Sequence, residues 1–179
     1  MERNSLGHIL IIPIGPVEMG ILTEIAGALA RVFRCETATG EGMAVPEGTF
    51  DARRGQYHSS AILGELLARK PVNAFRLLGV IDNDLFVPRL NFVFGEADRE
   101  GGVAVVSLAR LREEFYGRRA DAALFRSRTI KEAVHEIGHT LGLDHCPAPR
   151  CVMAFSNSLD DTDRKGAELC DRCRGLLGC

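Results

Sequence analysis

The stretch that decides the fold of this chain is HEIGHTLGLDHC, residues 135–146, which places three histidines, a glutamate and a cysteine within twelve residues. His135 and His139 are one helical turn apart, so their Cβ atoms are expected about 5–6 Å apart on one face. One zinc ion with Zn–N bonds of about 2.0–2.1 Å can bridge that span. Gly142 can end the helix and turn the chain, which brings His145 beneath the ion as a third ligand. Three protein ligands plus a water are typical of a catalytic zinc site.

Glu136 is predicted to be a general base and not a ligand, because it can take a proton from the water at the open position of the metal. The alternative is an amphipathic helix with surface histidines. Three of only five histidines in the chain stand at ligand spacing, with Gly142 between them and Met153 downstream. This pattern favours the metal site over the surface helix.

The length of 179 residues predicts one catalytic domain, residues 1–179, with an upper part, residues 1–142, and a lower part, residues 143–179. The net charge of −2 gives no electrostatic argument for binding nucleic acid or an anionic membrane. The apolar run 9–14 contains Pro13 and is too short for a signal-peptide core or a membrane span. We therefore expect a cytoplasmic monomer.

A second metal site is predicted from four cysteines that follow the histidines, the last two as a Cys-x-x-Cys pair. They are Cys146, Cys151, Cys170 and Cys173. Four thiolates are the ligand set of a closed structural zinc, and the short C-terminal segment needs such a staple. Two disulfides or unlinked buried thiols are the alternatives. Cys35 and Cys179 are interpreted as inert thiols.

Basic residues stand around these cysteines and are expected either to offset the charge of the thiolates or to form a solvated face. They are Arg150, Arg164, Lys165, Arg172 and Arg174. In total the sequence predicts two zinc ions, one catalytic and one structural.

Upstream, strand-like and helix-like segments alternate, which predicts an α/β (α+β) domain with a mixed sheet covered by helices. Strands are expected at 8–15, 35–43, 75–81, 91–95 and 103–109, and helices at 16–33 and 56–69. The last two strands flank a turn at 98–102 and form a hairpin. The active-site helix begins between Asp121 and Thr129, and Thr129 with Glu132 can form a capping box.

The motif His135-Glu136-x-x-His139-x-x-Gly142-x-x-His145, with Met153 downstream, resembles the metzincin metallopeptidases. The four cysteines make the chain similar to the archaemetzincins within that clan. The resemblance rests on residues 135–173. It implies a substrate cleft between the two parts of the domain, a methionine floor at Met153 and an edge strand, here 91–95, that pairs with an extended peptide.

The predicted activity is hydrolysis of peptide bonds in a peptide or protein substrate, with Glu136 passing the proton of the water to the leaving amine. Phe155 stands where astacin-like metzincins place a tyrosine, so that phenol is missing here. Glu96 and Asp98 can anchor a peptide α-amino group if the enzyme is an aminopeptidase, or they are solvated turn residues. Asp82 and Asp84 are interpreted as loop residues.

Two alternatives from other functional classes remain open at this stage. One is a zinc-stabilised peptide-binding protein with little or no proteolytic activity, against which Glu136 argues because binding needs no general base. The other is a structural module with two zinc ions, which requires a fourth protein ligand beside the three histidines.

Overall fold

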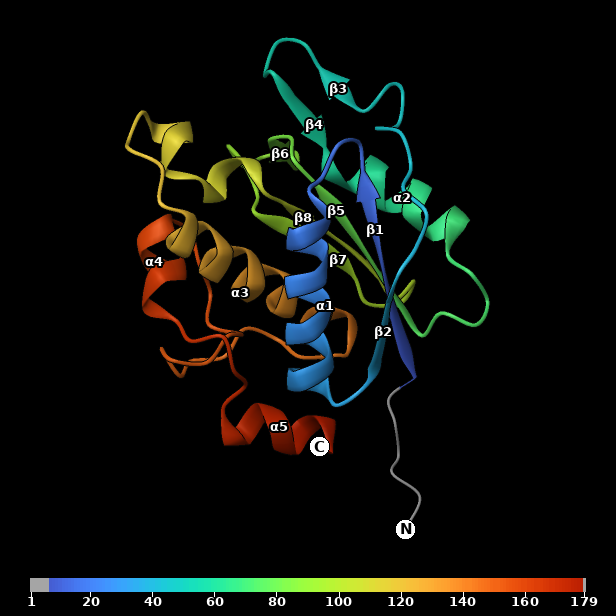
Figure 1. Cartoon of the computed structure of the whole chain (residues 1–179), viewed down its shortest axis with the longest axis vertical. Helices are drawn as coiled ribbons and strands as arrows, with labels where there is room; N and C mark the ends of the chain where they lie inside the picture. The colour runs from blue at the N-terminus through green and yellow to red at the C-terminus, as the bar shows by residue number, and fades with distance from the viewer. Residues whose placement is uncertain (1–6, 179) are drawn as a thin grey trace.

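The computed structural model describes residues 7–178, which form a five-stranded sheet with helices on both faces and a small second sheet (Figure 1). The large sheet has the strand order β2-β1-β5-β8-β7. Its strands are β1 (His8–Ile14), β2 (Glu36–Thr39), β5 (Arg76–Ile81), β7 (Gly95–Asp98) and β8 (Val103–Ser107). Every pairing is parallel except that of β7 with β8. The predicted α/β mixed sheet with an antiparallel edge strand is therefore confirmed.

The small sheet has the order β3-β4-β6 and lies near the end of β1 (Figure 1). Its strands are β3 (Phe50–Asp51), β4 (Gln56–His58) and β6 (Leu85–Phe86). The helices are α1 (Met19–Phe33), α2 (Ser59–Arg69), α3 (Ala122–Thr140), α4 (Leu159–Arg164) and α5 (Asp171–Leu177). Two 3₁₀ turns, Ala109–Leu111 and Glu113–Tyr116, connect β8 to α3. No helix within residues 7–178 is long and apolar enough to cross a membrane.

The two faces of the large sheet are buried by different helices because successive strand side chains point in opposite directions. Ile9 and Ile11 of β1 pack in one core with the apolar residues of α1 and α3. Ile12 and Ile14 pack in a second core with Ile62 of α2. The sheet thus supports α3 through β7 and β8, with α1 packed beside it on the same face.

The edge strand lies further along the chain than the sequence indicated. It was expected at residues 91–95, but β7 spans Gly95–Asp98. The earlier residues pair elsewhere: Val93 forms a bridge with Leu85 of β6, and the carbonyl of Asn91 accepts hydrogen bonds from Arg54 and Gln56. The small sheet therefore competes for this segment, and a hairpin pattern cannot reveal that long-range competition.

The start of α2 and the capping residue of α3 also differ from expectation, whereas the start of α3 lies within the predicted range. Residues 56–58 form strand β4, so α2 begins only at Ser59. The predicted capping box of Thr129 and Glu132 is wrong, because both residues are buried inside α3. The helix begins at Ala122, and the Asp121 carboxylate accepts a hydrogen bond from the Leu124 amide at 2.9 Å.

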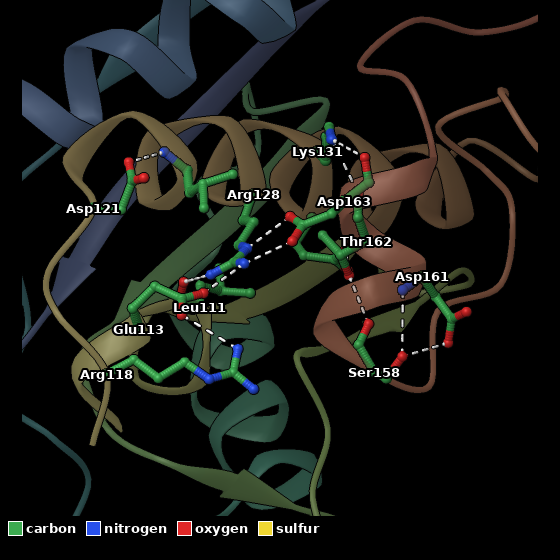
Figure 2. A network of polar contacts seen from close by, with 12 residues as sticks. Leu111, Glu113, Arg118, Asp121, Arg128, Lys131, Ser158, Asp161, Thr162 and Asp163 are labelled. Atoms are coloured by element: carbon green, nitrogen blue, oxygen red, sulfur yellow. Dashed lines mark hydrogen bonds and ion pairs between the residues drawn. The ribbon is translucent and has the colours of Figure 1, made fainter. Parts of the chain in front are cut away.

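Figure 2 shows how α3 is fastened to α4. The Arg128 side chain is 2% exposed and donates two hydrogen bonds to Asp163, at 2.7 and 2.6 Å. The same guanidinium pairs with Glu113 at 2.7 Å and donates to the Leu111 carbonyl. Such a buried charge is tolerated because each nitrogen of the guanidinium has an acceptor and two carboxylates balance the charge. It ties the active-site helix to the segments on both sides.

The C-terminal segment packs into the same core as the sheet and α1. Its buried members include Leu143, Cys146, Cys151, Val152, Met153, Leu169 and Cys173. A division at residues 142 and 143 therefore marks a change of layer and not a separate hydrophobic core. In the view of Figure 1, α5 lies below the lower end of α1.

Candidate metal centre and active site

The end of α3 is shaped by Gly142, which adopts φ +94° in the left-handed region. The Leu143 amide donates to the Gly138 carbonyl at 3.0 Å, and the Gly142 amide donates to the His139 carbonyl at 3.0 Å. These bonds satisfy carbonyls that the helix leaves free at its end. The chain turns there as predicted, so His145 returns toward the helix.

The three histidines converge on one point. The Nε2 atoms of His135 and His139 are 3.0 Å apart, and one nitrogen from each of the three rings lies within 4.8 Å of the others. Two nitrogens bound tetrahedrally to one zinc at about 2.0–2.1 Å would be separated by about 3.3–3.4 Å. Burial lowers the pKa of His135, His139 and His145, which favours the neutral imidazole that a metal requires.

Backbone carbonyls orient two of the rings from behind. His135 Nδ1 donates to the Val152 carbonyl at 2.9 Å, and His139 Nδ1 donates to the Leu143 carbonyl at 2.8 Å. With Nδ1 protonated, the lone pair of each ring is on Nε2, which faces the shared point. The residues present therefore fit a zinc ion with three histidine ligands, and no protein carboxylate or thiol joins this group among residues 7–178.

Glu136 is the carboxylate beside this group. It is buried, and burial, followed by the nearby charge of Glu132, raises its pKa well above the ordinary value for a glutamate. No hydrogen bond or ion pair within the described part of the chain engages its carboxylate. A carboxylate with a raised pKa and no protein partner is suited to accept a proton.

A pocket of about 290 Å³ opens over these residues. Its walls come from residues 92–97 of the edge-strand region, from α3, and from Phe155, Ser156 and Asn157 after the methionine turn. Gly95 at the start of β7 is in direct contact with the base: a Cβ there would lie 2.6 Å from Glu136 Cγ and 2.7 Å from its Oε1. A larger hollow of about 960 Å³ beside α2 contains no histidine or cysteine and lies apart from this chemistry.

Met153 is fully buried against the helix that carries the histidines. Its side chain contacts the α-carbon region of Gly138, where any added Cβ would collide with the Met153 sulfur. The Met153 carbonyl accepts a hydrogen bond from the Cys146 amide at 2.8 Å, which couples this turn to the residue after His145. The placement matches the predicted floor under the histidines.

The four predicted cysteines form a second cluster, and their sulfurs all lie within 4.8 Å of one another. Cys146 and Cys170 have an Sγ–Sγ distance of 3.7 Å, as do Cys151 and Cys173. These distances are too long for a disulfide and close to the edge, about 3.8 Å, of a tetrahedron with Zn–S bonds of about 2.3 Å. The Cys173 amide, by hydrogen bonding, lowers the pKa of Cys170 to about 7, whereas burial raises the pKa of Cys151.

The other two cysteines are not brought to this cluster by the structure. Cys35 is a buried free thiol whose pKa burial raises to about 11, in agreement with an inert role. Cys179 lies outside the described residues. All five described cysteines are free thiols.

The remaining candidate residues divide between the pocket and the scaffold. Asp98 accepts bonds from the Glu100 and Gly101 amides and so stabilises its turn. Glu96 lines the catalytic pocket and accepts hydrogen bonds from Ser59 and from Ser60, the latter at 2.8 Å. Phe155 is 62% exposed and packs edge-on against the His145 ring.

Asp82 and Asp84 are structural, since they pair with Arg112 and Arg110. Lys165 does not accompany the cysteines as expected. It is buried against Glu132 and His135. No sequence signal distinguished Lys165 from the other basic residues near the cysteines, because burial of a lysine depends on a partner brought in from another element.

Comparisons with known proteins agree with this geometry. Residues 31–178 match the model of peptidase family M54. The archaemetzincin of Pyrococcus abyssi is 40% identical over 174 residues, which cover 94% of this chain and 93% of the relative. The crystal structure of an archaemetzincin from Methanopyrus kandleri is similar with a TM-score of 0.85 and 36% identity, covering 99% of this chain and 97% of that one.

A zinc-dependent peptidase from Methanocorpusculum labreanum is similar in structure, with a TM-score of 0.86, 33% identity and coverage of 94% of this chain and 99% of that one. The likeness therefore extends far upstream of the motif at 135–146. Together with the converging histidines, these matches identify the chain as a member of peptidase family M54, a zinc metallopeptidase of the archaemetzincin type.

Proposed function

We propose that this peptidase uses His135, His139 and His145 as the ligands of a catalytic zinc and Glu136 as its general base. The observation that carries the proposal is the convergence of three imidazole nitrogens beside a buried carboxylate that has no protein partner. Gly142 and Met153 support the ligands, since the one turns the chain back and the other packs beneath α3.

The chain contributes the following steps. The extended substrate lies along β7, whose outer edge is unpaired in the large sheet, so main-chain hydrogen bonds can align it. His135, His139 and His145 would hold the zinc ion, which when bound would supply the Lewis acidity that acidifies a water and polarises the scissile carbonyl. Glu136 takes the proton of that water and passes it to the leaving amine. The apolar walls of the pocket exclude bulk water and strengthen these charge interactions.

We propose a second, structural zinc bound by Cys146, Cys151, Cys170 and Cys173, which makes two ions per chain. The tetrahedral spacing of the sulfurs supports this assignment. Glu96, at the wall of the pocket, is the candidate anchor for a substrate α-amino group. Asp98 is not a candidate, because it does not line the pocket and its carboxylate stabilises its own turn. We further propose that the protein acts as a monomer in the cytoplasm, where free thiols persist.

The test is a Glu136→Gln variant compared with the wild type for metal content and for cleavage of a fluorogenic peptide library. The amide cannot accept the proton, so we expect the zinc content to stay the same and turnover to fall at least about 10²-fold. Equal cleavage by the two proteins would remove Glu136 from the mechanism. Cleavage by neither protein, with zinc present in both, would favour the peptide-binding alternative.

A further inference from the structure

Lys165 and Glu132 form an ion pair in the interior of the protein. The Lys165 Nζ lies 3.0 Å from Glu132 Oε1, and the two side chains are 1% and 3% exposed. The hydroxyl of Thr162 donates to the same carboxylate oxygen at 3.0 Å. Glu132 is on the active-site helix, whereas Lys165 directly follows α4, so the pair joins two elements.

This ion pair is in contact with the first histidine. The Lys165 Nζ lies 3.4 Å from His135 Nδ1, the atom that donates to the Val152 carbonyl. The ring edge opposite the metal is therefore flanked by a carbonyl on one side and by an ammonium on the other. His135 Nε2 on the opposite edge is the atom that approaches His139.

The pair also separates the roles of two glutamates. Glu132 and Glu136 are one turn apart on α3, and both line the catalytic pocket. Glu132 is engaged by Lys165 and Thr162, while Glu136 has no partner among the described residues. Two carboxylates thus receive different tasks from their surroundings.

Stability alone does not account for this arrangement, because a buried ion pair can commonly be replaced by packed apolar side chains without loss of stability. We propose that Lys165 and Glu132 form a charge clamp that positions the His135 ring, and through it the catalytic metal, relative to Glu136. The two charges cancel, so the clamp adds no net charge behind a metal ligand, and removing one of them leaves the other facing His135. The inference rests on the metal-binding role proposed above for His135.

The clamp is tested on metal binding without any substrate. The four-cysteine site is first filled with one equivalent of zinc, and cobalt is then titrated while its visible absorption is followed. Absence of a thiolate-to-cobalt charge-transfer band shows that the cobalt lies at the histidines. Peptide cleavage and the melting temperature are measured on the same proteins.

The decisive variant is the double substitution Lys165→Met and Glu132→Leu, which replaces the ion pair with apolar side chains. We expect its melting temperature to stay near that of the wild type. Its cobalt affinity is expected to fall at least about 10-fold, as is typical when support behind a metal ligand is lost, and kcat to fall with it. If the pair were purely structural, the double variant would have the cobalt affinity and kcat of the wild type as well as its melting temperature.

Glu132→Gln is the second variant, because it keeps the shape of the side chain and an acceptor for Lys165 and Thr162. It should fold even if the double variant does not, and we expect weaker cobalt binding because the Lys165 charge is no longer cancelled. Folded Glu132→Gln protein with wild-type cobalt affinity and wild-type kcat would overturn the clamp.

Lys131→Met is the matched control. Lys131 is also a buried lysine at the junction of α3 and α4, where its Nζ donates to the Thr162 and Asp163 carbonyls (Figure 2). It contacts none of the three histidines. We expect a lower melting temperature with unchanged cobalt affinity. If this control lost as much cobalt affinity as the clamp variants, any loosening of the α3–α4 junction would be enough to weaken metal binding. The clamp would then be wrong.

The failure of this inference can be told apart from failure of the proposed function. Wild-type protein that binds no cobalt at the histidines would refute both. Wild-type protein that binds cobalt and cleaves peptides, alongside clamp variants that do the same, would refute the clamp alone.

Discussion

Gly95 contributes to the catalytic pocket by having no side chain. The side chain of Glu136, the proposed general base, occupies the space that a Cβ at this position would fill, and the Val105 carbonyl lies 2.7 Å from the same point. The Val105 carbonyl belongs to the sheet and cannot move easily, so an added Cβ would displace the Glu136 side chain. The position of the Glu136 carboxylate therefore depends on a glycine in another element.

We predict that Gly95→Ala lowers kcat by about 10²-fold, because displacing a catalytic group by about 1 Å has an effect of that size. The added methyl group must push Glu136 or the edge strand aside, and overpacking of this kind also costs about 1–3 kcal/mol of stability. Steady-state cleavage and thermal melting measure the two effects, and metal analysis verifies that zinc is kept.

Gly64→Ala on α2 is the control for this substitution. A Cβ at Gly64 would meet no atom within 4 Å, so alanine should stabilise the helix slightly and leave cleavage unchanged. If Gly95→Ala cleaved peptides as fast as this control, the close approach would have no role in catalysis.

At the level of elements, the active-site helix is held at both ends and along its side. Asp121 caps its first turn, Gly142 ends it, and Arg128 binds it to Asp163 of α4. His135 and His139, two of the proposed metal ligands, stand near the end of this helix, where helices commonly fray. These restraints keep the last turn, and so the spacing of His135 and His139, in place.

We predict that Asp121→Ala lowers the free energy of unfolding by about 1 kcal/mol, because the Leu124 amide loses its acceptor. For a chain of this size that corresponds to a decrease of about 2–4 °C in melting temperature. Differential scanning calorimetry of the zinc-loaded protein provides the measurement.

Glu18→Ala at the start of α1 is the comparison for the cap. Glu18 occupies the equivalent position but makes no side-chain capping bond, so the substitution should change the melting temperature little. Equal effects of the two substitutions would mean that the Asp121 bond contributes nothing.

At the level of the whole molecule, the two proposed metal sites would have different tasks. The cysteine cluster lies within the main core and joins three separate parts of the C-terminal segment. The histidine cluster borders an open pocket. A closed site contributes directly to folding, whereas an open one is free to bind substrate.

We therefore predict that Cys170→Ser destabilises the protein more than His139→Ala does. The first substitution breaks a four-ligand site that staples the C-terminal segment, and the second removes one ligand from a site on a helix that the core already holds. Thermal melts of both variants, each with its zinc content determined, give the ranking. A larger loss for His139→Ala would reverse the assignment of structural and catalytic roles.

Local sequence determined the spacing of the proposed ligands, the turn and the main strands. The spacing of His135, His139 and His145 depends only on helix geometry and on the backbone freedom of Gly142, so it could be predicted without the rest of the chain. The same holds for β1 and β5, whose long apolar runs identify buried parallel strands. The two predicted ligand clusters did assemble, each from the residues named in advance.

Tertiary structure alone decided the features that depend on a partner from elsewhere in the chain. The edge strand is β7 and not residues 91–95, because Val93 pairs with β6. Lys165 is buried because it forms an ion pair with Glu132 inside the fold. The absence of a side chain at Gly95 matters only because Glu136 packs against this position in the folded protein. A sequence pattern within one segment indicates helix and strand geometry. The pairing of strands, the burial of charged side chains and the close approach of two elements depend on contacts that form only when the chain is folded.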